Sequence, residues 1–419
     1  MKKIIHSFAQ TFSPLRNRNL SAYLGGQLIS LLGSAMQATA QSWVVWQISH
    51  STRALGFTLM LDYLPMLLLG AFAGTWADRM DRRKLLIASQ LSAMLLAVVF
   101  ALLVQTGLIQ LWHIYLLAAL LGCVMAIDMP AQTAFVGDLS GIEQMRGAIV
   151  LNNMVRQISR TAGPALAGVV IGLLDVAPAF WINGASFLAV VGSLLYVRSQ
   201  QVRNPQATRT KTQLKEAFQF ISKEPRIRDL LLFSACVPFF AISAIGLIPA
   251  IVTDYLHAGP GALGLIMSSA GAGAFFGSLV VVPMTHQIRH PGLLLTAAMV
   301  WIGAWFMVIA YSGQTWFWVI GIFIANAAVP VVLTTSAGLL QVLAPPDMKA
   351  SMMGIWMMLS FGMQPFGALL IGFIAQVVGA QTAIFFYGSA MILVSAAMLL
   401  ASKGLHIWQP ELPSYSIRR

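Results

Sequence analysis

The stretch GTWADRMDRRK, residues 74–84, decides the fold of this chain. It separates a long apolar run at residues 55–76 from a second one at residues 85–103. Residues 78–84 contain four cations and two carboxylates, and such a density of charge is not stable in hydrocarbon. We therefore predict a tight loop between two membrane spans. Because basic loops stay on the cytoplasmic side, this loop fixes the orientation of every other segment.

The composition agrees with a membrane protein. Of the 419 residues, 58% are hydrophobic and 9% are charged, and the mean hydropathy is +0.79, whereas soluble domains are about 25% charged. A helical span needs about 20 residues, and twelve stretches of the chain are long enough. The predicted spans are residues 20–48, 53–76, 84–106, 112–138, 144–174, 177–198, 228–254, 260–284, 291–311, 316–342, 349–378 and 381–402.

The positions of the basic residues explain the net charge of +12. In this topology 22 of the 25 Lys and Arg residues fall in cytoplasmic segments, as the positive-inside rule describes. Only Arg53 is outside, and Arg156 and Arg160 lie within a span. The charge therefore gives no support to nucleic acid as a partner. We expect a multi-pass protein of the bacterial inner (cytoplasmic) membrane, with both termini in the cytoplasm.

The chain repeats one plan twice. GAFAG at residues 70–74 recurs as GAFFG at residues 273–277, and MRG at residues 145–147 matches MKA at residues 348–350, both at an offset of 203 residues. We predict an all-α protein of twelve transmembrane helices in two pseudo-symmetric halves of six. The predicted parts are an N-terminal half at 1–198, a cytoplasmic linker at 199–227, a C-terminal half at 228–402 and a cytoplasmic tail at 403–419.

The loop at residues 74–84 resembles the signature between helices 2 and 3 of the major facilitator superfamily, Gly-x-x-x-Asp-Arg-x-Gly-Arg-Arg/Lys. The matching positions are Gly74, Asp78, Arg79, Arg82 and Arg83. Where the general pattern has glycine this chain has Asp81, as in the branch that contains the bacterial enterobactin exporter. The resemblance implies the major facilitator fold, and it implies that these five residues act as a conformational switch.

A second resemblance lies in the fifth predicted span. RTAGPALAG, residues 160–168, is similar to the helix-5 signature of the superfamily's drug and proton antiporters, Gly-x-x-x-Gly-Pro-x-x-Gly-Gly. Gly163, Pro164 and Gly168 match, and small residues replace two glycines. Glycine and proline let helices approach closely and bend the axis. This resemblance favours an exporter, but the fourth span lacks the arginine of many antiporters, so the coupling machinery must differ from theirs.

Five polar residues in the first span are spaced 3, 4, 3 and 4 positions apart: Gln27, Ser30, Ser34, Gln37 and Gln41. This spacing lines them along one face of a helix, and such a polar stripe does not face lipid. The stripe either forms hydrogen bonds between helices or lines a water-accessible cavity for substrate. We favour the cavity, because three glutamines exceed what packing alone requires.

Four ionisable residues lie within spans of the N-terminal half: Asp62, Asp128, Arg156 and Arg160. With a rise of about 1.5 Å per residue, Asp128 and the two arginines fall near one depth, and we expect pairing across helices 4 and 5. An unpaired charge there costs at least about 2.5–3.5 kcal/mol. Asp62 has no cation at its level in its own helix. We predict a proton-coupling site among these four residues with Asp62 as the carrier; simple hydrogen bonding of Asp62 to a neighbouring helix is the alternative.

The C-terminal half has no carboxylate within its spans 8–12. Its polar residues include Asn326, Ser360 and Gln364, and methionines cluster around Trp356. A flexible Met-rich surface suits loosely specific hydrophobic ligands, although lipid-facing or core packing explains such residues equally well. We predict that these four residues contribute to the substrate site.

These features predict a secondary active transporter and not an enzyme. The chain has no Gly-x-x-x-x-Gly-Lys-Ser/Thr loop, so an ion gradient rather than ATP supplies the energy. We expect no cofactor and no metal, because neither the histidines nor the two cysteines have ligand spacing. The resemblance implies a proton-coupled efflux antiporter that exports an amphipathic small molecule, a drug or siderophore, as in multidrug resistance, and we expect a monomer. Two alternatives are an ion-coupled importer of a small nutrient and a polytopic membrane enzyme or assembly factor.

Overall fold

The computed structural model describes residues 12–197, 219–285, 290–345 and 348–401, and within these ranges the chain forms helices and no strands. The all-α prediction is confirmed. The first bundle contains η1 (Ser13–Arg16), α2 (Arg18–Ser49), α3 (Thr52–Arg79), α4 (Arg82–Gln105), α5 (Leu111–Leu174) and α6 (Ala177–Tyr196).

The second bundle is divided into more pieces. Proline interrupts its spans at positions such as Pro238, Pro330 and Pro365, and each of these residues lies in the first turn of a new segment. The segments are α8 (Pro225–Cys236), η2 (Val237–Ile242), η3 (Ile245–Leu247), α9 (Ile248–Ala250), η4 (Ile251–Tyr255), α10 (Pro260–Phe276), η5 (Gly277–Val281), α11 (Val282–Thr285), α12 (Pro291–Ala310), α13 (Thr315–Ala327), α14 (Val329–Leu343), α15 (Lys349–Gly362), α16 (Gln364–Val378) and α17 (Ala380–Ala401).

Eleven helical segments of the described chain are long and apolar enough to cross a membrane. Helix α5 supplies two of them, because Gly141 has a φ of 67° and breaks the helix between residues 111–141 and 147–174. Helix α2 is not among the eleven. Its 32 residues are more than a span needs, but its polar stripe lowers its hydropathy. The prediction of twelve spans is thus supported for eleven by length and hydropathy and for the twelfth by length alone.

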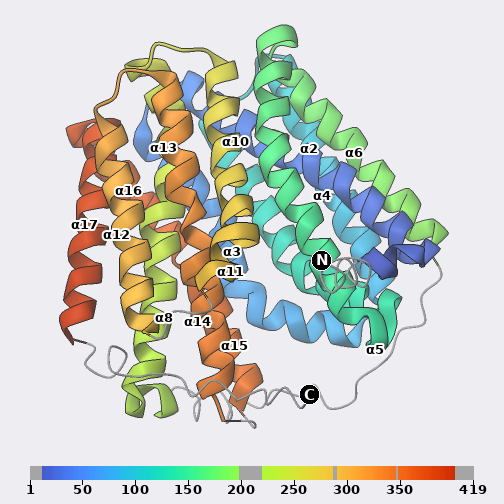
Figure 1. The fold of residues 1–419 in the computed structure, drawn as a ribbon. Helices are drawn as coiled ribbons and strands as arrows, with labels where there is room; N and C mark the ends of the chain where they lie inside the picture. Colours follow the sequence, from blue (N-terminus) through green and yellow to red (C-terminus); the bar gives the residue numbers. More distant parts are fainter. Residues whose placement is uncertain (1–11, 198–218, 286–289, 346–347, 402–419) are drawn as a thin grey trace.

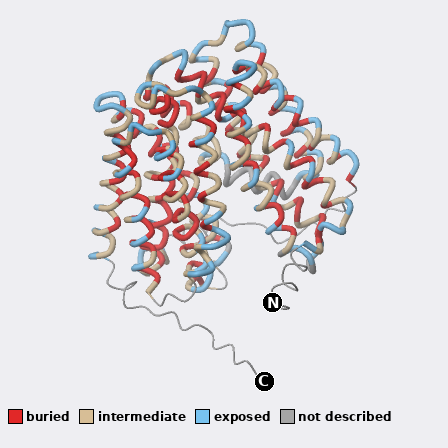
Figure 2. Tube along the Cα trace, turned by 45° about the horizontal axis from the view of Figure 1, so that its top comes forward, coloured by how far each residue is buried: buried red, intermediate tan, exposed pale blue. Residues whose placement is uncertain are grey.

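The two bundles lie close together at one end of the molecule and farther apart at the other (Figures 1 and 2). We call the end where α3 passes into α4, at residues 80–81, the signature end. The opposite end, where α2 passes into α3 at residues 50–51, is the far end. Contacts between the bundles run along α3 against α16 and along α5 against α10.

Glycine makes the contact between α3 and α16. Gly56 of α3 faces Ala368 and Gly372 of α16, and a Cβ on Gly372 would lie 2.7 Å from the carbonyl oxygen of Thr52. The Thr52 hydroxyl donates to the Gly372 carbonyl at 2.9 Å. Backbones therefore meet without intervening side chains, as small residues allow in membrane helices.

Glycine also makes the contact between α5 and α10. Gly168 of α5 faces Gly264 of α10, where an added Cβ would lie 2.6 Å from the carbonyl oxygen of Pro164. Gly163 instead faces Ala35 of α2 within the first bundle. The helix-5 motif therefore lies where three helices approach closely, as its residue types indicate. We call the four residues Gly56, Gly372, Gly168 and Gly264 the glycine seam.

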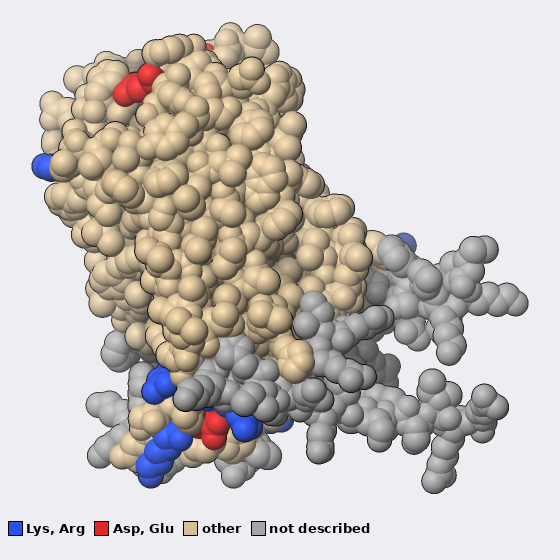
Figure 3. Space-filling view, turned by 60° about the vertical axis from the view of Figure 1, so that its left-hand side comes forward, with Lys and Arg blue, Asp and Glu red and all other residues tan. Residues whose placement is uncertain are grey.

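Charge is distributed as a membrane requires. Figure 3 shows Lys and Arg side chains gathered at the signature end of one face, below a broad band that is almost free of charge. In the described part of this end, Lys223 and Arg228 are exposed. A band without charge between two polar ends is what a hydrocarbon layer allows.

Candidate functional site

The signature loop ties three helices together. Asp81, in the glycine position of the general pattern, caps α4 by accepting the Lys84 backbone N–H at 3.2 Å. Arg82 forms an ion pair with Asp138 of α5 at 2.8 Å, with side chains only 12% and 7% exposed. The sequence analysis did not single out Asp138. This residue is the last one of the predicted fourth span, which placed it at the same end as the loop.

Arg83 holds the end of α6. Its Nε donates to the Leu194 carbonyl at 2.5 Å and its Nη2 to the Leu195 carbonyl at 2.7 Å. A cation at a helix C-terminus bonds the last carbonyls and is favoured by the helix dipole. The side chains of residues 70–79 lie outside the described part of the structure. Three signature residues, Gly74, Asp78 and Arg79, are among them, so a switch role for the motif stays a prediction.

Asp128 lies at the centre of a hydrogen-bond network inside the first bundle. Its side chain is 1% exposed. Oδ1 accepts from Ser89 Oγ at 2.5 Å and from Gln90 Nε2 at 3.0 Å, and Oδ2 accepts from Gln132 Nε2. The Ser30 hydroxyl of α2 donates to Gln90 Oε1 at 3.3 Å. The network therefore joins α5 to α4 and α2.

Arg156 reaches this network indirectly. Its Nη2 donates to Gln132 Oε1 at 2.6 Å, and no ion pair of the described residues joins Arg156 to Asp128. The pairing expected between the fourth and fifth predicted spans, which are the two parts of α5, thus runs through the amide of Gln132. Gln132 lies one turn after Asp128, which places it between the two charges. Arg160, one turn beyond Arg156, is exposed.

Asp62 has a simpler environment on α3. The Gln41 amide Nε2 contacts its Oδ1 at 3.3 Å and its Oδ2 at 3.2 Å. Among the described residues, Gln41 is the single side chain that donates to this carboxylate. The next residue, Tyr63, interacts with Gln364 of α16 and lies within electrostatic range of Arg160. Asp62 thus lies on the helix that packs against the second bundle.

The polar stripe of α2 bonds to three neighbouring helices. Ser30 contacts Gln90 of α4, Gln41 contacts Asp62 of α3, and the Asn183 amide of α6 donates to Gln37 Oε1 at 2.7 Å. Side chains of Gln27, Ser30, Gln37 and Gln41 are at most 5% exposed, whereas Ser34 is half-buried. In this conformation the stripe forms hydrogen bonds between helices, which was the alternative to a cavity. A substrate cavity along the stripe stays a prediction.

The four candidate residues of the second bundle do not form one cluster of hydrogen bonds. The Asn326 amide donates to the Ile322 carbonyl of its own helix at 2.9 Å, and the Trp356 indole donates to Ser234 Oγ of α8 at 2.8 Å. Ser360 and Gln364 are buried one turn apart. Gln364 interacts with Tyr63 of α3.

The arrangement matches known transporters. A family model described as "transmembrane secretion effector" matches residues 9–412. The chain belongs to this family of the major facilitator superfamily. It is 26% identical over 402 residues to YfiS, an uncharacterized transporter of this type from Bacillus subtilis strain 168, covering 92% of this chain and 94% of YfiS. It is 24% identical to the enterobactin exporter EntS of Citrobacter koseri, covering 94% and 93%.

Solved structures agree on the fold. A bacterial homolog of the human lysosomal transporter Spinster, in an inward-facing and unoccupied conformation, superposes with a TM-score of 0.73 and 15% identity, covering 95% of this chain and 99% of that one. Membership of this family makes the protein a multi-pass membrane transporter of small molecules rather than an enzyme. In such transporters the substrate passes between the two halves, so a residue's position relative to the seam bears on its role. Asp62 lies on the seam helix α3, whereas Asp128 lies inside the first bundle.

Proposed function

We propose that this transporter is a proton-coupled exporter of an amphipathic small molecule, a drug or siderophore, in a bacterial inner membrane. One observation carries the proposal: Asp62, on the helix that packs against the second half, is held by a single neutral amide. A carboxyl without an ion-pair partner binds and releases a proton without leaving a cation unpaired. Its place on α3 links that proton to the movement of one half against the other.

The comparisons support outward transport, and the exposed cations support the orientation of the protein in the membrane. The family is described as a secretion effector, and the relative EntS is an enterobactin exporter. The exposed basic residues Lys223 and Arg228 favour a cytoplasmic signature end. In that orientation the bundles separate toward the cytoplasm (Figure 2), an arrangement through which exporters and importers both pass.

The remaining candidates take different roles in this proposal. Asp128, Gln132 and Arg156 form a fixed brace between α4 and the two parts of α5. The exposed Arg160 and the buried Gln364 shape the path between the halves, with Tyr63 between them. During the transport cycle, the polar stripe of α2 exchanges its interhelical bonds for contacts with substrate.

Everted membrane vesicles test the proposal. Vesicles with and without the protein receive a panel of siderophores and cationic dyes, and a pH gradient is imposed in the presence or absence of an uncoupler. We expect at least one compound to accumulate inside the everted vesicles and the uncoupler to release it. Accumulation in right-side-out vesicles instead would identify an importer. Accumulation that ignores the uncoupler would reject proton coupling.

A further inference from the structure

A groove of about 600 Å³ lies at the far end, where the first turns of α3 and α5 meet α16 of the second half. This volume is within the range of about 300–1,000 Å³ that small-molecule sites occupy. Arg53 and Phe57 line the groove from the first half, and Leu369 and Phe373 line it from the second. Neither the signature loop nor the coupling proposal uses it, since Asp62 lies more than two turns deeper along α3 than Arg53.

The groove is polar at the end of the molecule and apolar farther in. Ser49, Ser51 and Arg53 lie where α2 ends and α3 begins. One helical turn deeper, Phe57 lies on α3 and Tyr115 on α5, with ring centroids 4.9 Å apart. A bilayer has the same order of layers, with polar headgroups outside and hydrocarbon inside. The groove therefore matches an amphiphile that lies in the membrane.

Arg53 supplies the charge of the groove. It is exposed, and it is the one Lys or Arg that the predicted topology places at this end. Its guanidinium carbon lies 5.2 Å from the centroid of the Phe373 ring, within the range of a cation–π contact, so a residue of the second half positions it. No ion pair of the described residues joins Arg53 to a carboxylate. A guanidinium without a counter-charge is available to a phosphate, which it binds through two parallel N–H groups.

The lining favours an anionic lipid over other phosphates. None of the described residues that line the groove is acidic, so an ammonium group finds no counter-charge there. The apolar rings of Phe57 and Phe373 are 36% and 46% exposed. An acyl chain covers such apolar surface, whereas a soluble phosphate leaves it uncovered. A phospholipid of net negative charge therefore fits both the cation and the apolar walls.

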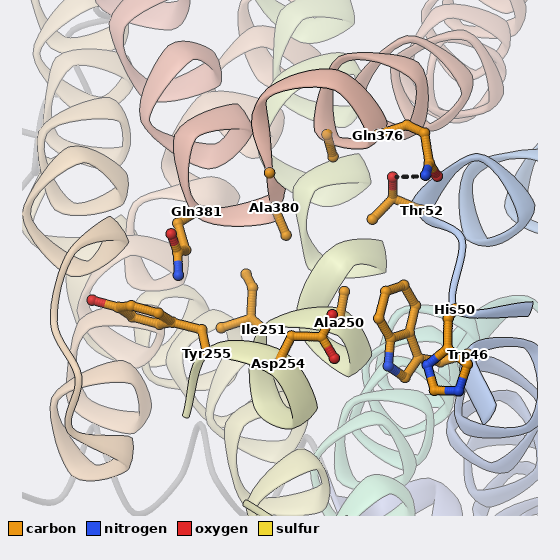
Figure 4. A pocket seen from close by; sticks show the side chains of 12 residues that line it. Trp46, His50, Thr52, Ala250, Ile251, Asp254, Tyr255, Gln376, Ala380 and Gln381 are labelled. Carbon is orange, nitrogen blue, oxygen red and sulfur yellow. Dashed lines mark hydrogen bonds between the residues drawn. The ribbon is translucent and has the colours of Figure 1, made fainter. Parts of the chain in front are cut away.

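Direct hydrogen bonds join the two halves beside the groove. The Ser51 hydroxyl donates to Gln376 Oε1 of α16 at 2.9 Å. The Thr52 hydroxyl donates to the same oxygen at 3.4 Å (Figure 4). Such bonds between α3 and α16 exist only while the far end is closed, so the groove in this shape belongs to the closed conformation. A ligand that touches both walls stabilises that conformation.

We propose that this groove binds a phospholipid of net negative charge from the leaflet at the far end, and that binding stabilises the closed far end. The phosphate accepts hydrogen bonds from Arg53, and an acyl chain lies against Phe57, Leu369 and Phe373. The lipid bridges α3 and α16 as a bound ligand and is not the transported cargo, so the inference goes beyond the proposed function.

Three compounds test the binding chemistry on the purified full-length protein in a non-ionic detergent. Dioleoyl phosphatidylglycerol has charge and chains, dioleoyl phosphatidylcholine has the same chains without net charge, and glycerol 3-phosphate has the phosphate without chains. We expect phosphatidylglycerol to raise the thermal unfolding midpoint saturably, at concentrations about tenfold lower than phosphatidylcholine needs, and glycerol 3-phosphate to have no effect. Equal potency of the two lipids, or stabilisation by glycerol 3-phosphate, would overturn the proposal. Since no transport is measured, the result is independent of the proposed function.

Matched variants locate the site. Arg53→Gln should remove the advantage of phosphatidylglycerol over phosphatidylcholine, whereas Lys223→Gln, which removes an exposed cation at the signature end, should keep it. Leu369→Trp fills the apolar part of the groove and should also remove the advantage. Its control is Leu370→Trp, because Leu370 is exposed and does not line the groove. An advantage that persists in Arg53→Gln and Leu369→Trp would overturn the proposal; if Arg53→Gln does not fold, the two tryptophan variants decide.

Spin labels test the effect on conformation. In a variant with Cys123 and Cys236 replaced by serine, one label is placed at Leu108 in the first half and one at Val377 in the second. Both positions are exposed at the far end and lie outside the groove. The population with a short distance between labels should be larger in phosphatidylglycerol nanodiscs than in phosphatidylcholine nanodiscs, and Arg53→Gln should remove this difference. Equal populations in the two lipids would overturn the stabilisation of the closed far end.

Discussion

Asp62 and Asp128 are two carboxylates of the same bundle with different surroundings. Asp128 accepts hydrogen bonds from three side chains and reaches Arg156 through Gln132. Asp62 shares one amide, that of Gln41, between its two oxygens. Asp128 is enclosed between α4 and the two parts of α5, while Asp62 lies on the helix that packs against the second half.

The difference shows that the number of donors around a buried acid bears on its role as much as its depth does. Hydrogen bonds to the charged form of a carboxyl group favour that form, so a carboxylate that accepts three of them binds a proton less readily. One that accepts a single amide gains a proton with little rearrangement. We therefore assign bracing to Asp128 and proton transfer to Asp62, and four substitutions test the assignment.

The largest expected effect is that of Asp62→Asn. The amide keeps the shape and a hydrogen-bonding partner for Gln41 but carries no titratable proton. Gradient-driven transport in proteoliposomes should fall to the level of empty liposomes, while substrate binding without a gradient stays unchanged. Normal transport by this variant would remove Asp62 from the coupling site and make Asp128 the candidate.

Asp128→Asn should act on stability. Its new NH2 group replaces one carboxylate oxygen and opposes either the Gln132 donor or the Ser89 and Gln90 donors, and Arg156 loses its indirect counter-charge, so we expect a loss of about 3 kcal/mol in the free energy of unfolding. Adding Arg156→Gln should recover part of this loss, with a coupling of about 1–2 kcal/mol. Arg160→Gln is the matched control and should rescue nothing, because Arg160 is exposed. Equal rescue by both arginine variants would contradict the bridge through Gln132.

Gln41→Leu should slow transport by about tenfold, equivalent to one hydrogen bond of about 1.4 kcal/mol. The amide positions the Asp62 carboxylate but carries no proton, so coupling should persist. Gln37→Leu, on the same stripe, is the control, because Gln37 bonds to Asn183 and not to Asp62. Transport rates in proteoliposomes at a fixed pH gradient measure both. A larger loss with Gln37→Leu would show that the stripe matters through substrate rather than through Asp62.

Ser89→Ala should have the smallest effect. It removes one of three donors to Asp128, so we expect about 1 kcal/mol lower stability and normal transport. The thermal unfolding midpoint and the initial transport rate report the two quantities separately. Impaired transport at normal stability would mean that Asp128 changes its partners during the cycle, and the contrast with Asp62 would fail.

The sequence predicted the features that belong to one helix. The spacing of Gln27, Ser30, Gln37 and Gln41 places them on one face, and the structure buries all four. The helix-5 glycines indicated close approach, and Gly163 and Gly168 do meet other helices. Helical periodicity and rise are properties of a single chain segment, which is why these inferences succeed.

The contacts between helices were harder to predict. The rise per residue placed Asp128 and Arg156 at one depth, but it did not give the rotation of their helices about their own axes. That rotation put Gln132 between them and left Arg160 exposed. Neutral amides such as Gln90 and Gln132 carried no charge that would have marked them as partners. Gln90 stood out only as a polar residue in the apolar run at 85–103.

The glycine seam has a mechanical consequence. Where two backbones touch directly, no side chains interlock, so one helix can rotate against the other without a change of side-chain rotamers. The glycine seam can therefore serve as a pivot. Gly56 lies near one end of α3 (Thr52–Arg79), and Pro65 lies inside the helix between Gly56 and the opposite end. A tilt of α3 about Gly56 therefore moves the residues near the pivot little and the opposite end of the helix much more. A rotation that barely changes the packing at Gly56 therefore produces a large displacement at the opposite end of α3.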